Sequence, residues 1–304
     1  MSELAKITVA PNGVRPRKRD HACLPVTLPE IVRTARCTHA AGAAMMHLHV
    51  RDADERHVLD AGLFRESCQA VREAVPGMAV QVTTEAAGRY DAAEQRRFAR
   101  EALDFADAVS FSVAEMFADD AGGAASAFYR EAHGRGVPVQ HIVYRARDTR
   151  LLATLVRTGL IPEARPQALF VLGRDTGHAA PGDILPFLKL TRGLDLDWAA
   201  CAFGPRETAC LAQAARLGGK VRVGFENNWI NADGTVAASN AERVREVALA
   251  IEGALAIAAP AAPTSTSTSA LAPRRPAPAP RRRLDLTRIA PTSVALEALV
   301  GVPA

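Results

Sequence analysis

The stretch AAMMHLHVRDAD, Ala43 to Asp54, places two histidines, with one residue between them, inside an apolar run. Side chains two residues apart on a β-strand point to the same side. If the run is a strand, His47 and His49 face one point, and the apolar residues between and beside them face the other way. A single buried histidine is usually a satisfied core residue, but two imidazoles that converge on a buried point are typical of a metal site. The stretch therefore predicts a buried strand that carries a candidate metal site.

Seven further short runs of apolar and β-branched residues recur along the chain. Amphipathic segments separate them, such as LPEIVRTARCTHAAG at 28–42, with a proline near its start and a glycine at its end. Eight strands that alternate with helices over about 250 residues have the count and size of a closed (β/α)8 TIM barrel. An open doubly wound sheet is the alternative, but no G-x-G-x-x-G follows the first run. We therefore expect a TIM barrel with strands at 7–11, 45–50, 79–84, 108–113, 137–144, 168–173, 197–204 and 221–226.

Length and composition are those of a soluble globular protein. The chain has 304 residues, of which 48% are hydrophobic, so it can bury a large core. Its five cysteines are scattered and include no C-x-x-C pair, which indicates free thiols in a reducing compartment. There is no run of about 18 apolar residues and no signal-peptide architecture. We therefore expect a cytoplasmic protein without a membrane-spanning segment.

Residues 259–304 differ in composition from the rest of the chain. They are rich in Pro, Ala, Ser and Thr, so we expect a disordered tail after a barrel domain of residues 1–258. The tail carries six arginines and two acidic residues, and therefore the whole formal net charge of +4. The barrel domain is formally neutral, and nucleic-acid binding is not expected. Residues 292–300 are weakly amphipathic, which predicts a short frayed helix or, alternatively, a segment that docks on another subunit.

The eighth run, VRVGFENNW at 221–229, places the carboxylate of Glu226 on an otherwise apolar strand. In a closed barrel strands eight and two are separated only by strand one, and active sites lie at the C-terminal ends of the strands. Glu226 can therefore reach a metal held by His47 and His49. Two neutral imidazoles and one carboxylate form a catalytic zinc set with an open coordination position. The plainer alternative for Glu226 is a salt-bridged carboxylate at a strand end.

Two motifs, HLHVRD at 47–52 and GGKVRVGFE at 218–226, are highly specific when they occur together. With NGVRPRKRDHACLPVTLPEIV at 12–32, they make the sequence resemble the β-keto acid cleavage enzymes, typified by 3-keto-5-aminohexanoate cleavage enzyme. The resemblance extends over 7–257. It implies a TIM barrel, a zinc ion, a homotetramer, and a reaction in which a β-keto acid and acetyl-CoA become acetoacetate and a new acyl-CoA.

The resemblance also implies roles for individual residues. His47, His49 and Glu226 match the zinc ligands, and Arg222 matches an arginine that assists the base and the substrate charge. Further residues are candidates for binding the keto acid, two of them hydroxyls for its carboxylate and two in the first loop: Thr83, Ser112, Asn12 and Arg15.

The expected general base is missing. Asn227 stands where the family has an aspartate directly after the metal glutamate, and an amide cannot accept a proton at neutral pH. The segment TTEAAG at 83–88 replaces the family's T-T-G-G. Glu85 in this segment, or a metal-bound hydroxide, is therefore the candidate base.

Two further departures concern the substrate pocket. Gln140 and His141 stand in the fifth strand where a glutamate is usual. In the first loop, Val14 and Arg15 stand where the family can carry a glutamate that binds a substrate ammonium group. This argues against an amino-keto acid and favours an anionic or neutral keto acid.

Three hypotheses follow from these observations. The first is a zinc-dependent β-keto acid cleavage enzyme that uses acetyl-CoA. The second is a metal-dependent hydrolase or lyase on the same barrel, which needs no separate carbanion base. The third is a zinc-binding paralogue without catalysis, which the altered site and the long tail both allow.

Overall fold

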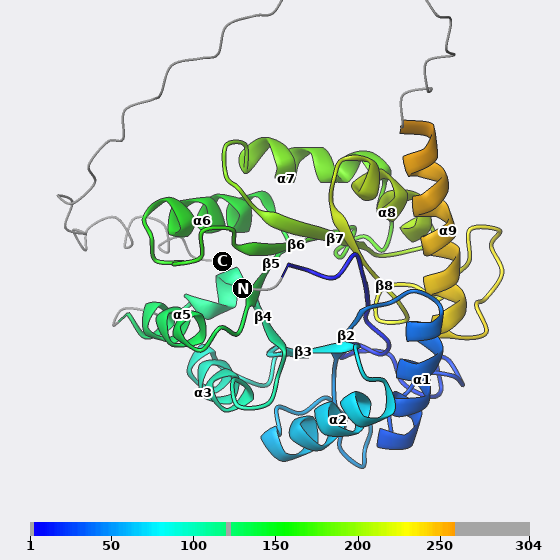
Figure 1. Cartoon of the computed structure of the whole chain (residues 1–304), viewed down its shortest axis with the longest axis horizontal. Coiled ribbons are helices and arrows are strands. Elements are labelled where there is room, and N and C mark those ends of the chain that lie inside the picture. The colour runs from blue at the N-terminus through cyan, green and yellow to red at the C-terminus, as the bar shows by residue number, and fades with distance from the viewer. Residues whose placement is uncertain (1–2, 120–122, 259–304) are drawn as a thin grey trace, which may run out of the picture.

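The computed structural model describes residues 3–119 and 123–258, and these form a closed barrel of parallel strands inside a ring of helices (Figure 1). The strands follow one another around the barrel in chain order, and β1 lies between β2 and β8. The TIM-barrel prediction is confirmed. Each predicted run matches one strand, which ends earlier than expected, and β6 and β8 each begin one residue before their predicted run. The strands are β1 (Ile7–Val9), β2 (Met45–Leu48), β3 (Ala79–Thr83), β4 (Ala108–Ser112), β5 (Val139–Val143), β6 (Gln167–Leu172), β7 (Asp197–Ala202) and β8 (Lys220–Val223).

Helices cover the outside of the barrel, and local capping residues determine where some of them begin. α3 begins with a capping box, in which Asp91 accepts the N–H of Glu94 at 2.8 Å and Glu94 accepts the N–H of Asp91 at 2.9 Å. The helices are α1 (Leu28–Ala40), α2 (Ala61–Ala74), α3 (Ala92–Ala102), α4 (Val113–Met116), α5 (Ala124–Gly134), α6 (Ala146–Arg157), the 3₁₀ turn η1 (Pro181–Ile184), α7 (Leu185–Leu190), α8 (Glu207–Arg216) and α9 (Asn240–Ala258).

Alternation along each strand separates an outer apolar layer from the barrel interior. Met46, Leu48 and Val50 belong to the outer layer beneath the helices, as the strand pattern predicts. The interior is itself divided. Its β5–β7 side is lined by an apolar cluster that includes Ile142, Leu169, Val171, Ala199 and Cys201. The buried polar residues on this side, Gln140, Gln167 and Asp197, lie nearer the start of the three strands. The other side of the interior, from β8 through β4, contains buried polar residues: Thr8, His47, Gln81, Thr83, Ser110, Ser112 and Arg222.

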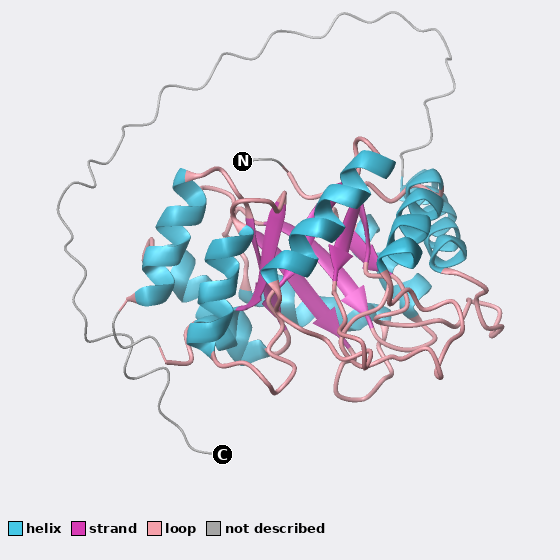
Figure 2. Ribbon diagram, turned by 90° about the horizontal axis from the view of Figure 1, so that it is seen from below, coloured by secondary structure: helices cyan, strands magenta, loops and turns pink. Residues whose placement is uncertain are grey.

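The longer loops gather at the end of the barrel toward which the strands run (Figure 2). This is the end at which TIM barrels carry their active sites. Within the described ranges, no helix is long and apolar enough to cross a membrane. The predicted basic tail, 259–304, and its terminal helix lie outside the described residues.

Candidate metal centre

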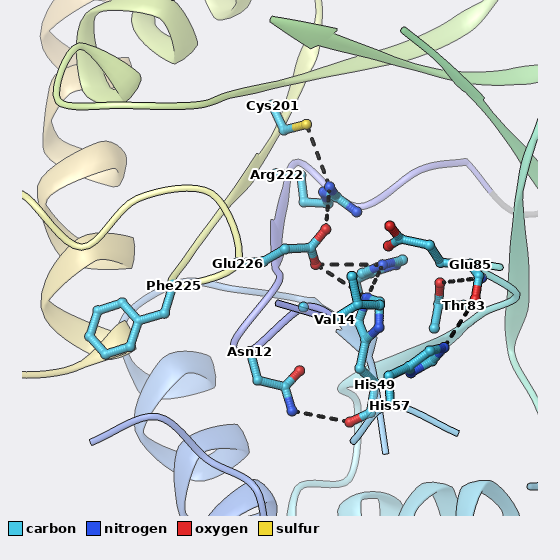
Figure 3. Close-up of polar contacts among 12 residues, drawn as sticks. Asn12, Val14, His49, His57, Thr83, Glu85, Cys201, Arg222, Phe225 and Glu226 are labelled. Atoms are coloured by element: carbon cyan, nitrogen blue, oxygen red, sulfur yellow. Dashed lines mark hydrogen bonds and ion pairs between the residues drawn. The ribbon is translucent and has the colours of Figure 1, made fainter. Parts of the chain in front are cut away.

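Three potential ligand atoms converge at this end of the barrel (Figure 3). His47 Nε2 lies 3.2 Å from His49 Nε2, and Glu226 Oε2 lies 3.7 Å from the former and 3.4 Å from the latter. Both imidazoles are buried, and the Glu226 side chain is 11% exposed. The sequence prediction is corrected in one detail, because β8 ends at Val223 and Glu226 lies in the following loop.

A hydrogen bond orients one of the two imidazoles. His47 Nδ1 lies 2.8 Å from Gln81 Oε1, and an amide oxygen can only accept, so Nδ1 carries the proton. The other ring nitrogen, Nε2, therefore carries a lone pair, and it lies 3.2 Å from His49 Nε2 and 3.7 Å from Glu226 Oε2. Gln81 is held in turn, because its amide nitrogen donates to Gln140 Oε1 at 3.2 Å. This chain of contacts gives His47 the tautomer of a metal ligand.

The protonation states also suit a cation. Burial, and then the charge of Arg222, lowers the pKa of His47 to about 4, and burial lowers the pKa of His49 well below its ordinary value. Both rings are therefore neutral at pH 7, which is the form that binds metal. Burial alone would raise the pKa of Glu226, but the Arg222 guanidinium and the imidazoles hold it well below its usual range. The site thus offers two neutral nitrogens and one carboxylate.

The loop after β1 passes directly over Glu226. Gly13 has φ +59°, and a methyl group on its α-carbon would overlap Glu226 Cγ, so only glycine allows this approach. On the other side, Arg222 Nη2 donates to Glu226 Oε1 at 2.9 Å. Glu226 Oε2 is buried and has no hydrogen-bond partner among the described residues, although it lies 3.4 Å from His49 Nε2 and 3.7 Å from His47 Nε2. A buried carboxylate oxygen without a hydrogen bond, beside two neutral imidazoles, fits a bound divalent cation.

A cavity lies next to the ligand set. Its lining residues are Val14, Arg15, Pro16, Glu85, Tyr144, Val171, Arg174, Phe203, Arg222 and Glu226. The carboxylate of Glu85 points toward Glu226 (Figure 3). Burial, and then the negative charge of Glu226, raises the pKa of Glu85 to about 7. A carboxyl group with this pKa can take up and release a proton at neutral pH.

The predicted substrate-binding residues differ in their surroundings. Arg15 is exposed and lines the cavity. The hydroxyl of Thr83 accepts the N–H of Glu85 at 3.1 Å, and the hydroxyl of Ser112 accepts the N–H of Glu115 at the start of α4. Thr83, Ser112 and Asn12 are not among the residues that line the cavity. The amide of Asn12 donates to the carbonyls of Pro25 and His49, which ties the first loop to the backbone of a metal-ligand candidate.

Asn227 follows Glu226 but is not among the residues that line the cavity. It is 7% exposed, and within the part of the chain that the structure describes neither atom of its side-chain amide has a hydrogen-bond partner. Gln140 and His141 stand in β5 where the family usually has a glutamate. The side chain of His141 faces away from the barrel interior and stacks on Tyr129, with ring centroids 5.2 Å apart.

Sequence reasoning missed several residues around the site. Gln81 could have been found, because the register pairs it with His47 on the adjacent strand. His57 follows β2 in a loop, and its Nε2 lies 3.1 Å from the carbonyl of Glu85. Arg174 reaches the cavity from the loop after β6, and no motif marked it. Loop residues such as these have no periodicity from which their direction can be deduced.

The sequence matches the family described as beta-keto acid cleavage enzyme over residues 5–263. The chain belongs to this family. The match confirms the resemblance that the sequence motifs carry, and with it the expectation of a β-keto acid cleaving enzyme.

Curated relatives cover most of the chain. It is 30% identical over 262 residues to the 3-keto-5-aminohexanoate cleavage enzyme of Acetoanaerobium sticklandii, covering 84% of this chain and 94% of the relative. It is 28% identical over 274 residues to the 3-oxoadipate:acetyl-CoA acetyltransferase of Cupriavidus necator, covering 83% and 90%.

Solved structures support the fold. A complex of ObcA with oxaloacetate superposes with a TM-score of 0.63 at 18% identity, over 76% of this chain and 64% of that one, so this chain spans just under two thirds of ObcA. A type I 3-dehydroquinate dehydratase from Clostridium difficile gives a TM-score of 0.55 at 11% identity, over 83% and 92%. At these identities the likeness concerns the barrel alone.

Proposed function

We propose that the protein is a zinc-dependent β-keto acid cleavage enzyme that uses acetyl-CoA. The observation that carries the proposal is the convergence of His47, His49 and Glu226 on one buried point beside a cavity that Glu85 faces. Family membership and the acetyl-CoA in the name of one relative support it. Two nitrogens and one carboxylate suit zinc and leave room for a substrate.

The ligand set defines where the keto acid binds. A divalent cation held there would polarise a keto group and acidify the adjacent C–H bond. Arg222 keeps Glu226 ionised and oriented through their 2.9 Å ion pair. Thr83 and Ser112, at the ends of β3 and β4, supply hydroxyls for the carboxylate of the keto acid, and Arg15 adds a positive charge at the cavity. Asn12 contributes indirectly, by fixing the backbone at His49.

Glu85 is the proposed general base. It lines the cavity, faces the ligand set and has a pKa of about 7, so it can remove a proton from the carbon between the carboxylate and the keto group. The resulting carbanion attacks the thioester carbonyl of acetyl-CoA and releases the CoA thiolate. The thiolate then attacks the original keto carbon, and the bond between this carbon and the carbanion carbon breaks. The products are acetoacetate, which recovers the proton from Glu85, and a new acyl-CoA.

The proposal can be tested with a panel of β-keto acids. The purified zinc-loaded protein should form acetoacetate and an acyl-CoA in equal amounts, and only when acetyl-CoA is present. Loss of the keto acid without any need for acetyl-CoA would instead indicate a hydrolase or lyase. A protein that binds zinc but consumes no keto acid would indicate a non-catalytic paralogue.

Homotetrameric assembly and a cytoplasmic location stay predictions.

A further inference from the structure

The cavity beside the ligand set has an uneven distribution of charge. Three guanidinium groups line it, those of Arg15, Arg174 and Arg222, against the two carboxylates of Glu85 and Glu226. Arg222 is occupied by Glu226, but Arg15 makes no ion pair with any described residue. A bound divalent cation would add to the positive excess. One carboxylate on a substrate therefore does not balance the charge of this cavity.

Arg174 is the arginine best prepared to bind an anion. Its guanidinium carbon lies 4.1 Å from the centre of the Tyr144 ring, and this contact fixes the plane of the group. Among the described residues its one hydrogen-bond acceptor is Glu85, at 3.4 Å. The side chain is 26% exposed. An arginine has five N–H donors in a rigid fork, so most of those of Arg174 are available to a bidentate carboxylate.

The remaining lining residues are suited to a short carbon chain. Val14, Pro16, Val171 and Phe203 supply an apolar surface between the cations. Since no acidic residue stands in the first loop at 12–16, no carboxylate there favours an ammonium group on the substrate. The lining thus favours a molecule with an anionic group at each end and methylene groups between them.

We propose that the keto acid carries a second carboxylate at the far end of its chain, and that Arg174 binds this carboxylate and determines specificity for dicarboxylic β-keto acids. The inference rests on the proposed function, whose site it describes. Binding of the distal carboxylate to Arg174 competes with the contact between Arg174 and Glu85. It therefore leaves Glu85 free to accept the substrate proton when the correct acid is bound.

A pair of matched ligands tests the proposal by binding alone. The probes are a six-carbon 3-keto dicarboxylate and its distal methyl monoester, titrated calorimetrically into the zinc-loaded full chain without acetyl-CoA. The wild-type protein should bind the diacid about 10- to 100-fold more tightly, as expected for charge-assisted hydrogen bonds to a carboxylate. Arg174→Met should reduce this ratio to near one, whereas Arg174→Lys should retain part of it.

The control variant is Arg145→Met. Arg145 is an exposed arginine next to Tyr144 that pairs with Asp175 and does not line the cavity. It should keep the wild-type preference for the diacid. Equal binding of both probes by the wild-type protein, or an unchanged ratio in a folded Arg174→Met, would overturn the proposal.

The outcomes separate this proposal from the proposed function. A preference for the diacid that depends on Arg174 would support the specificity assignment even in a protein that forms no acetoacetate. Acetoacetate formed from monocarboxylic acids alone would support the function and overturn the assignment. In another outcome, Arg174→Met raises the KM for acetyl-CoA and leaves the preference for the diacid intact. This result would assign the Arg174 guanidinium to the CoA phosphates, and it would overturn the specificity assignment.

Discussion

The two sides of the barrel interior differ in chemistry although they share one backbone geometry. On the β5–β7 side, Leu169, Val171 and Ala199 form a buried apolar cluster. On the side from β8 to β4, polar residues occupy the equivalent inward positions, and His47 is one of them. The alternation of the strands is the same on both sides. The difference arises from which residue types the sequence places at the inward positions.

This comparison shows how the barrel combines stability with a reactive site. The apolar side buries surface, which stabilises the fold at about 25 cal/mol per Å². On the polar side, some buried atoms have no hydrogen-bond partner among the residues that the structure describes, including Glu226 Oε2 and His49 Nδ1. Such atoms cost stability when they are unpaired, so they are expected where a ligand binds. The apolar side thus mainly stabilises the barrel, and the polar side mainly provides groups that can bind a ligand.

The sharpest test compares one large-to-small substitution on each side. His49→Ala removes one of three proposed ligands, so the protein should lose its zinc, and acetoacetate formation should fall by at least about 10³-fold. Leu169→Ala, at a fully buried apolar position, should instead lower the free energy of unfolding by about 2–5 kcal/mol. Elemental analysis, product assays and denaturant unfolding measure these effects. Stoichiometric zinc in His49→Ala, or zinc loss in a folded Leu169→Ala, would contradict the division between the sides.

The next largest effect is expected at Glu85. Glu85→Gln keeps the shape of the side chain but cannot accept a proton, so kcat should fall by about 10²–10⁴-fold with zinc content unchanged. In the wild-type protein the base form exists above the pKa of about 7, so activity should decrease as the pH is lowered through this value. A bound cation favours the carboxylate and moves this decrease to lower pH. A Glu85→Gln variant that keeps the wild-type pH profile would show that another group removes the proton.

Asn227→Asp tests whether the missing aspartate can be restored. The family comparison suggests a gain, but Asn227 does not line the cavity, and neither of its amide atoms has a hydrogen-bond partner in residues 3–119 and 123–258. A carboxylate at this position would be buried without compensation. We therefore expect no increase in acetoacetate formation and a lower melting temperature. An increase of about 10²-fold, the lower range of general-base catalysis, would indicate that Asn227 replaces a lost base.

The sequence was sufficient for the barrel and for the convergence of His47, His49 and Glu226. Strand periodicity predicts that His47 and His49 share one side, and barrel closure brings Glu226 to them. Both deductions depend on regular geometry, which repeats along every strand.

Other features of the site could not be deduced from the sequence. Arg174 lies in a loop, and its contact with Tyr144 depends on where two loops meet. Asn12 belongs to a motif of the family, but its hydrogen bonds to backbone carbonyls depend on the path of the first loop. Loop paths follow from many tertiary contacts, which local sequence patterns do not encode.

The smallest effect is predicted for Gln81, which lies beside His47, a proposed metal ligand, on the adjacent strand. Gln81→Leu has similar volume but cannot accept the Nδ1 proton of His47, whose 2.8 Å hydrogen bond fixes the tautomer. The imidazole could then rotate or present the wrong nitrogen, so zinc affinity should fall by about 10–100-fold, the usual effect of losing such a partner. Competition with a chelator of known affinity measures the change. Gln69→Leu is the matched control, because Gln69 is exposed on α2, where its side-chain amide donates to Glu73, and it lies outside the candidate metal centre. Equal zinc affinity in both variants would mean that the polar side holds His47 by packing alone.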